Sequence, residues 1–401
     1  MIERLKNIGP GAIIAASFTG PGTVTTASVT GASFDYVLLW AVLVATLGTI
    51  VLQEMAVRVG IVTNEGLGEA MEGQFDNPIS HWGMALLVVG AIGIGAASYQ
   101  AGDLIGGAGG LTSLTGISEG YWGPLMGLTI AIVLFVGRYK LVERVLVGMV
   151  ALMAFSFLGA AVLAGPSIAS IATGFIPTGI PEGGLYLVTG IMGTQIVGYN
   201  LFLHASSANE RWGGSGNLRD ARTDTILSIG VGGLIMVAIM ITAAAAFPTG
   251  TEISGVGEMA DQIEPLVGSY AQTLFGIGLF AAGLSSGMTA PLGASYAICG
   301  IMNWEQDLKA PKFRAIWMSI VGFGLFATTV GFEPVSAIIF AQVANGLLLP
   351  ILAIFLLYVL NDRDLLDEYV NSATQNVLGG LVALFVIWLG LNTVIDVVGS
   401  L

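Results

Sequence analysis

The chain has 401 residues, of which 55% are hydrophobic and only 10% are charged, and its mean hydropathy is +0.85. Soluble domains carry about 25% charged residues, so this composition excludes a soluble protein and indicates an integral membrane protein. The formal net charge of −13 argues against nucleic acid as a partner. The single cysteine, Cys299, excludes an internal disulfide and a cysteine-based metal cage.

Apolar runs between polar breaks predict eleven transmembrane helices, each near the roughly 20 residues that cross a bilayer. The predicted spans are 8–31, 36–58, 82–105, 121–137, 143–164, 184–206, 225–247, 266–300, 314–331, 336–360 and 376–398. All thirteen Lys and Arg then fall on one side of the membrane, which the positive-inside rule makes cytoplasmic. We therefore expect one transmembrane domain over 1–401 in the cell membrane, with its N-terminus in the cytoplasm and its C-terminus outside.

The first span contains SFTGPGTVTTAS (17–28), in which Pro21 stands between two glycines. Pro21 cannot donate a backbone hydrogen bond, and Gly20 and Gly22 loosen the helix on either side. Such a break is tolerated inside a membrane only where protein or a watery cavity covers the freed groups. This segment alone predicts either an interrupted span or a kinked but intact helix.

The sixth span carries a matching polar, glycine-containing centre at 194–200, within GIMGTQIVGYNLFLHASS (190–207). Spans 1 and 6 are five spans apart, and this odd separation gives the two copies opposite orientations. Paired interruptions at corresponding places indicate a secondary transporter with an inverted repeat, whose substrate binds near the midplane where the interruptions meet. The predicted repeats cover about 8–164 and 184–360, and 376–398 is an additional helix.

At these residues the chain resembles the NRAMP family of proton-coupled divalent-metal transporters. The opening GPGAIIAASFTGPGTVTTASVTGASFDYVLLW (9–40) is similar, without gaps, to the family segment containing Asp-Pro-Gly-Asn. The third span, ASYQAGDLIGGAGGL (97–111), and the sixth, GTQIVGYNLFLHASS (193–207), follow further family patterns. GLSSGMTAPLGA (283–294) and AQVANGLLLPILAIFLL (341–357) extend the resemblance into the eighth and tenth spans. It implies an all-α, leucine-transporter-type fold with a 5+5 inverted repeat and broken helices 1 and 6.

Several family ligands are replaced in this chain. By the resemblance, the family's metal-binding aspartate falls on Gly20 and its asparagine on Thr23. The methionine of helix 6 that selects soft metals falls on Val197. On the third span, the family's aspartate is Gln100 and its glutamate is Asp103, so no carboxylate stands at the family's metal-binding position.

Other positions match the family in part. The first of its two histidines on helix 6 becomes Tyr199, while His204 keeps the second. An arginine of the ninth span aligns loosely with Met318. Gln342 matches the glutamine of helix 10 that joins the site, and Ser285 is a further candidate for the cavity.

The residues that remain are hard oxygen and nitrogen donors, together with backbone carbonyls freed by the breaks. Manganese or iron selection is helped by a soft sulfur ligand, whereas magnesium keeps several of its waters. The resemblance implies a divalent-metal transporter, and the residues favour Mg over Mn or Fe. The expected substrate-binding residues are Thr19, Gly20, Gly22, Thr23, Thr194, Gln195, Val197, Gly198, Tyr199 and Gln342, with Thr23, Thr194 and Gln342 as metal ligands.

Two other functions stay open. Without the aspartate, the break at 19–23 presents free amides at a half-helix N-terminus, which favours the carboxylate of a small organic acid or amino acid. A non-transporting membrane sensor is the second alternative. No Ser-His-Asp order, carboxylate pair or metal triad indicates an enzyme, and no cofactor is expected.

Ionisable residues within the spans are candidates for function, because charge at membrane depth is costly. By the resemblance, Asp103 lies at the family's proton-pathway position, and His204 could relay protons near neutral pH. The structural alternatives are a carboxylate facing water at the outer helix end and a hydrogen-bonded interior histidine. Glu54 and Arg58 are four residues apart, so we expect a structural ion pair.

Overall fold

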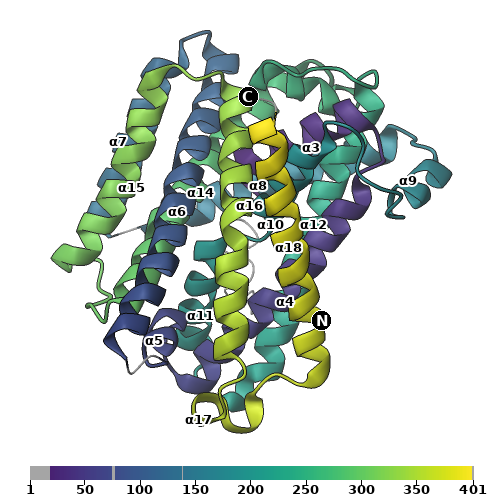
Figure 1. Ribbon diagram of the computed structural model, residues 1–401. Helices are drawn as coiled ribbons and strands as arrows, with labels where there is room; N and C mark the ends of the chain where they lie inside the picture. Colours follow the sequence, from purple (N-terminus) through teal and green to yellow (C-terminus); the bar gives the residue numbers. More distant parts are fainter. Residues whose placement is uncertain (1–18, 75–76, 138, 400–401) are drawn as a thin grey trace.

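The computed structural model describes residues 19–74, 77–137 and 139–399, which form helices packed side by side (Figure 1). Within these ranges, nine helices are long and apolar enough to cross a membrane. They are α4 (Leu39–Thr63), α6 (Pro78–Thr115), α7 (Glu119–Val136), α8 (Tyr139–Leu163), α12 (Leu218–Ala246), α14 (Ala271–Ile301), α15 (Pro311–Val330), α16 (Pro334–Val359) and α18 (Ala373–Gly399).

Three shorter helices correspond to the first and sixth predicted spans: α3 (Pro21–Phe34), α10 (Gly184–Gln195) and α11 (Gly198–Trp212). The start of the first predicted span, 8–18, lies outside the described residues. Every other predicted span overlaps a helix or the pair α10 and α11, which supports the segmentation, while the count of eleven crossings stays a prediction. The connections hold α5 (Leu67–Glu72), α9 (Ile168–Gly174), α13 (Glu264–Val267), α17 (Arg363–Leu366), η1 (Ser215–Asn217), η2 (Val256–Ile263), η3 (Gly268–Tyr270) and η4 (Asp367–Tyr369).

Helix α6 is longer than the third predicted span. It continues past residue 105 to Thr115 and ends at Gly116, whose φ of +69° lies in the left-handed region that glycine favours at a helix end. This length changes the position of Asp103. The structural alternative, in which its carboxylate faces water at the outer end, is excluded, because Asp103 is inside the helix and only 1% exposed.

Glycines allow the central helices to approach one another closely. In α6, Gly107 and Gly110 face Gly283 and Gly276 of α14, and a Cβ atom on any of these four would press on the opposite helix. Small residues at helix interfaces let backbones meet in this way within a membrane. As a result, α6 lies in the interior against α14, α15 and α16.

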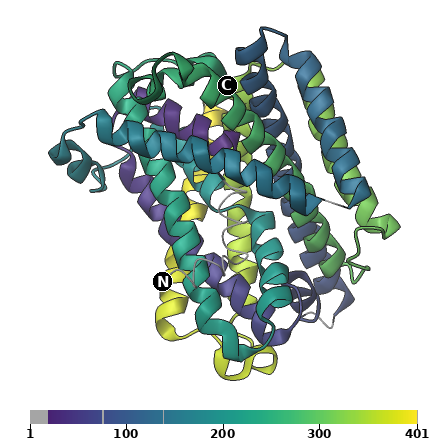
Figure 2. The ribbon, with the colours of Figure 1, turned by 180° about the vertical axis from the view of Figure 1, so that it is seen from behind.

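The outer helices present apolar side chains to the surroundings. Leu128 on α7, Phe155 on α8, Phe326 on α15 and Leu384 on α18 are each more than half exposed. Figure 2, the view from behind, shows α8 running across the neighbouring helices and not parallel to them. In water such a surface would be unfavourable, whereas lipid tails solvate it, so the chain is a multi-pass membrane protein.

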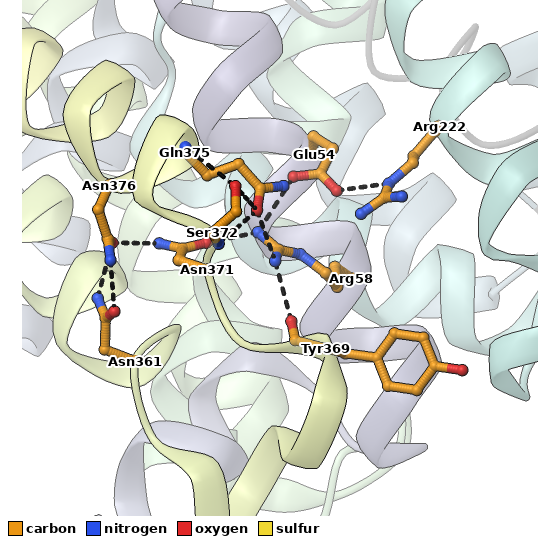
Figure 3. Close-up of polar contacts among 9 residues, drawn as sticks. All are labelled: Glu54, Arg58, Arg222, Asn361, Tyr369, Asn371, Ser372, Gln375 and Asn376. Carbon is orange, nitrogen blue, oxygen red and sulfur yellow. Dashed lines mark hydrogen bonds and ion pairs between the residues drawn. The ribbon is translucent and has the colours of Figure 1, made fainter.

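A polar network connects α4 to the segment that precedes α18 (Figure 3). The expected ion pair is confirmed: Arg58 Nη2 lies 3.2 Å from Glu54 Oε2. Glu54 also accepts a 2.7 Å bond from Arg222 Nε of α12. Arg58 donates to Asn371 Oδ1 (2.6 Å) and to the Tyr369 carbonyl (2.9 Å). The network therefore holds α4, α12 and the turn before α18 together.

The contact between α4 and α11 gives a test of this packing. A Cβ atom added at Gly60 would collide with the backbone carbonyl of Ala205, which cannot move without shifting α11. We expect Gly60→Ala to destabilise the protein by about 1–3 kcal/mol, seen as a lower melting temperature in detergent. Gly148→Ala is the matched control, because no described atom lies within 4 Å of its added Cβ. Equal melting temperatures for the two variants would contradict the close contact.

Candidate functional site

The sixth span is interrupted, as predicted. Helix α10 ends at Gln195, and α11 begins at Gly198. Between them, Ile196 (φ −95°, ψ 87°) and Val197 (φ −92°, ψ 116°) have non-helical backbone. The break is narrower than the polar segment that predicted it, and Ile196, an apolar residue at its centre, was not among the expected site residues.

The carbonyls at this break are hydrogen-bonded within the protein. Because α10 stops, the last carbonyls of its helix have no helical partner. The Gly193 carbonyl accepts from the Tyr99 hydroxyl (3.0 Å) and from Asn345 Nδ2 (2.6 Å), and Asn345 Nδ2 also lies 3.2 Å from the Ile196 carbonyl. These two carbonyls are thus hydrogen-bonded by side chains of α6 and α16, and the expectation that freed carbonyls serve as ligands stays a prediction.

Asn345 was missed by the sequence analysis. The available signal was an amide in the apolar middle of the tenth span, three residues after Gln342. Such an amide is costly in lipid unless it meets a polar partner. Its partners lie on α10, far away in the sequence, so the residue's role depends on the tertiary structure.

The described part of the first predicted span begins at the place where an interruption was predicted. Helix α3 begins at Pro21, and the preceding Gly20 is extended (φ −85°, ψ −175°). An intact helix would need helical angles at Gly20, so a kinked but continuous span is excluded at this residue. The half of the span before 19 lies outside the described residues.

The two interruptions meet. The hydroxyls of Thr23 on α3 and Thr194 on α10 are 2.7 Å apart. The amide of Gln342 on α16 fills the space beside Gly22, where a Cβ atom would collide with it. Both amide atoms of Gln342 are buried without a hydrogen-bond partner in the described part of the chain. Helices α3, α10 and α16 thus form a polar cluster in the interior, as the sequence predicted for these three residues.

Tyr199 joins this cluster from α11. Its ring packs edge-on against Tyr99 of α6, with 5.6 Å between centroids, and its buried hydroxyl has no hydrogen-bond partner among the described residues. Gly20, Gly22, Thr23, Thr194, Tyr199 and Gln342 are therefore the expected residues that the fold brings together.

Other expected residues point elsewhere or serve packing. Gln195 Nε2 lies 2.9 Å from the sulfur of Met236 on α12, outside the cluster. Gly198 faces Leu352 of α16, where a Cβ atom would collide with the leucine. Val197 and Thr19 are buried.

His204 lies fully buried on α11 and contacts a residue outside the cluster. Its Nδ1 is 2.9 Å from Gln53 Oε1 of α4, while its Nε2 has no partner among the described residues. This contact is the interior hydrogen bond that was one of its two expected roles. It leaves one ring nitrogen available for a proton.

Asp103 lies at the cluster, a position that the sequence did not predict. Its Oδ1 is 3.2 Å from the point where a Cβ atom of residue 20 would stand, and Ser286 Oγ of α14 is 3.2 Å from the same point. The close approach is possible because Gly106, one turn later on α6, packs directly on Pro21. Position 20 itself carries no carboxylate, as expected, but the Asp103 carboxylate of α6 lies beside it, together with Ser286.

The ninth span does not supply a charge here. Met318, aligned with the family's arginine, is 50% exposed and faces outward, whereas the neighbouring Trp317 is buried. Among the described residues the ion pairs are those of Glu54 with Arg58 and Arg222, so Asp103 has no basic partner there. No group of three or more His, Cys, Asp or Glu that could hold a metal occurs in the described residues. The cluster thus combines one carboxylate with neutral oxygens and amides, which favours a cation over an anion.

The capping of α10 by Asn345 gives a second prediction. In Asn345→Asp the side chain keeps its shape but loses the amide that donates to Gly193 and Ile196. An oxygen would then face these carbonyls, so we expect a loss of about 1–3 kcal/mol and a lower melting temperature. Asn392→Asp is the control, because Asn392 also donates to a carbonyl, that of Trp388, but at an exposed position. A melting temperature for Asn345→Asp equal to that of Asn392→Asp would show that the amide does not hold the break.

The whole chain is similar to known transporters. The family described as "Natural resistance-associated macrophage protein-like" matches residues 11–396. "Divalent metal cation transporter MntH" of Yersinia pestis is 26% identical over 398 residues, covering 97% of this chain and 94% of the relative. The same protein of Yersinia pseudotuberculosis matches equally.

Solved structures share the fold. The Eremococcus coleocola manganese transporter superposes with a TM-score of 0.80 at 20% identity, covering 97% of this chain and 86% of that one. MhsT, crystallised with L-phenylalanine, has a TM-score of 0.61 at 15% identity, covering 95% and 98%. These likenesses confirm the predicted leucine-transporter-type fold, and with the match over 11–396 they show that the chain belongs to the Nramp family.

Proposed function

We propose that this protein is a secondary transporter that carries a divalent metal cation through the polar cluster between its two interrupted spans. The observation that carries the proposal is the meeting of both interruptions at Thr23 and Thr194, with the Asp103 carboxylate beside Gly20. A buried site with a negative charge suits a cation. Relatives named as divalent metal cation or manganese transporters support the same substrate class and argue against an enzyme.

The cluster favours magnesium over manganese or iron. Its polar atoms are carboxylate, hydroxyl and amide groups, which are hard ligands. Val197 stands where the family has a methionine, and the nearby Met236 sulfur contacts Gln195. A magnesium ion that keeps several waters needs few protein ligands, which fits one carboxylate with Thr23, Thr194 and Gln342.

A small organic acid or amino acid is the alternative substrate. The α3 N-terminus, at Pro21, presents amides that favour an anionic group. The Asp103 carboxylate lies beside the same helix end and would repel such a group. The cluster therefore favours the cation, and a non-transporting sensor would bind it without moving it.

Proton coupling is assigned to Asp103 and His204, as the resemblance implies. Both side chains are buried within the bundle, and His204 keeps one ring nitrogen without a described partner. Transport then proceeds by alternating access, in which the half-helices at the two breaks move to open the cluster to each side in turn.

Binding of Mg²⁺, Mn²⁺ and Cd²⁺ to the purified protein tests which ion is the substrate. We expect isothermal titration and proteoliposome uptake to detect Mg²⁺ but not Cd²⁺, because no sulfur ligand faces the cluster among the described residues. Thr194→Val should weaken Mg²⁺ binding about 3- to 10-fold, the effect of one lost hydrogen-bonding oxygen. Thr129→Val on the exposed face of α7 is the control. Tighter binding of Mn²⁺ or Cd²⁺ would refute the magnesium preference, and stabilisation by glutamate alone would favour the organic acid.

Labelling from outside the cell tests the orientation. Cys299 is buried, so the unmodified protein should not react with a membrane-impermeant maleimide. Ser118→Cys, in the exposed loop before α7, should react in intact cells. Ser215→Cys, at an exposed position between α11 and α12 beside three arginines, should react only after permeabilisation. The reverse pattern would place the basic loops outside.

A further inference from the structure

The Asp103 carboxylate is buried without a basic partner among the described residues. It is 1% exposed, and its Oδ2 accepts no hydrogen bond from the described residues. The ion pairs in the described part of the chain belong to Glu54, so no lysine or arginine neutralises Asp103. Burying an unpaired charge is strongly unfavourable. A cation from outside the protein must therefore balance it, either a proton or the transported ion.

The position of the carboxylate bears on whether a proton or the transported ion balances its charge. Asp103 reaches the N-terminal end of α3 from α6, so its Oδ1 lies 3.2 Å from the point where the Cβ atom of residue 20 would stand. The backbone of Gly20 is in the β region, which any residue can adopt. Glycine is therefore not required there by backbone conformation. Because glycine has no side chain, it leaves space beside residue 20, and Asp103 and Ser286 lie next to that space.

Neutral donors surround the carboxylate. Ser286 Oγ and the Tyr199 hydroxyl are buried beside it, and both amide atoms of Gln342 and Gln100 are buried without hydrogen-bond partners among the described residues. Of the helices that carry them, α6 and α11 contact each other, and each also contacts α14 and α16. An oxygen-rich shell around a single carboxylate is what a hard, partly hydrated cation can use.

We propose that Asp103 is the direct anionic ligand of the transported cation, and that it takes over from α6 the role that a carboxylate at position 20 would have. The proposal rests on the proposed function and adds the residue that provides the charge. In this proposal the two positions are complementary. Residue 20 carries no side chain, and the Asp103 carboxylate of α6 occupies the neighbouring space.

Neutralising the carboxylate is the first test. Asp103→Asn keeps the side-chain shape and removes the charge, so we expect Mg²⁺ binding by titration to weaken about 100-fold or more and uptake into proteoliposomes to stop. Asp396→Asn, on the exposed face of α18, is the control and should bind like the unmodified protein. Melting temperatures without metal check that both variants fold.

Moving the carboxylate from α6 to α3 is the second and more specific test. In Gly20→Asp/Asp103→Asn the charge returns on α3, facing an amide that can donate to it. We expect this double variant to recover Mg²⁺ affinity to within about tenfold of the unmodified protein. A Cβ atom at residue 20 would lie 3.2 Å from the side chain at residue 103, so the first double variant requires a small shift. Gly20→Asp/Asp103→Ala leaves more room for the new aspartate and replaces the first double variant if that one does not fold.

The outcomes separate this proposal from the proposed function. If the unmodified protein binds and transports none of Mg²⁺, Mn²⁺ or Cd²⁺, the proposed function fails. If it binds Mg²⁺ and Asp103→Asn binds it equally well, Asp103 serves a proton only and the present proposal is overturned. An infrared difference spectrum gives an independent readout: adding Mg²⁺ should shift a carboxylate band in the unmodified protein and in Asp396→Asn, but not in Asp103→Asn.

Discussion

The structure depends on satisfying the backbone where the sixth span is interrupted inside the bundle. In the hydrocarbon region of a membrane no water is available to donate a hydrogen bond to an unpaired carbonyl. A break in a span therefore requires a polar side chain from another helix. At the sixth span, Tyr99 and Asn345 meet this need by donating to Gly193 and Ile196. These donors hold α10 against α6 and α16, and the hydroxyl contact of Thr23 with Thr194 then brings α3 to the same place.

Glycine determines how near these helices come. Gly106 lets α6 pack on Pro21, and Gly107 and Gly283 let α6 pack on α14. Through these contacts Asp103, which is on neither interrupted span, lies at the start of α3. The Nramp family fold is thus kept while the carboxylate of the site comes from a different helix. The charge at the cluster, and not the identity of the helix that carries it, is what matters for attracting a cation.

This arrangement explains how a member of the family can lose the ligands of helix 1 and helix 6 and still suit a divalent cation. The soft sulfur is gone at Val197, and the carboxylate at residue 20 is replaced by space. In the proposed function, what remains is a hard, neutral shell with one negative charge, which would suit a hydrated ion better than a bare transition metal. An organic anion would meet the same charge with repulsion.

The sequence by itself determined the membrane class, the order of the spans, the two interruptions and most residues of the cluster, because hydropathy, proline and glycine act locally along the chain. The family resemblance added the fold. Only the tertiary structure decided that Asp103 and Ser286 lie beside Gly20 and that Asn345 donates to the carbonyls at the end of α10. It also decided that Gln195 contacts Met236 and that Met318 is exposed. These facts depend on how helices rotate and how closely they approach, which is set by contacts between residues far apart in the sequence.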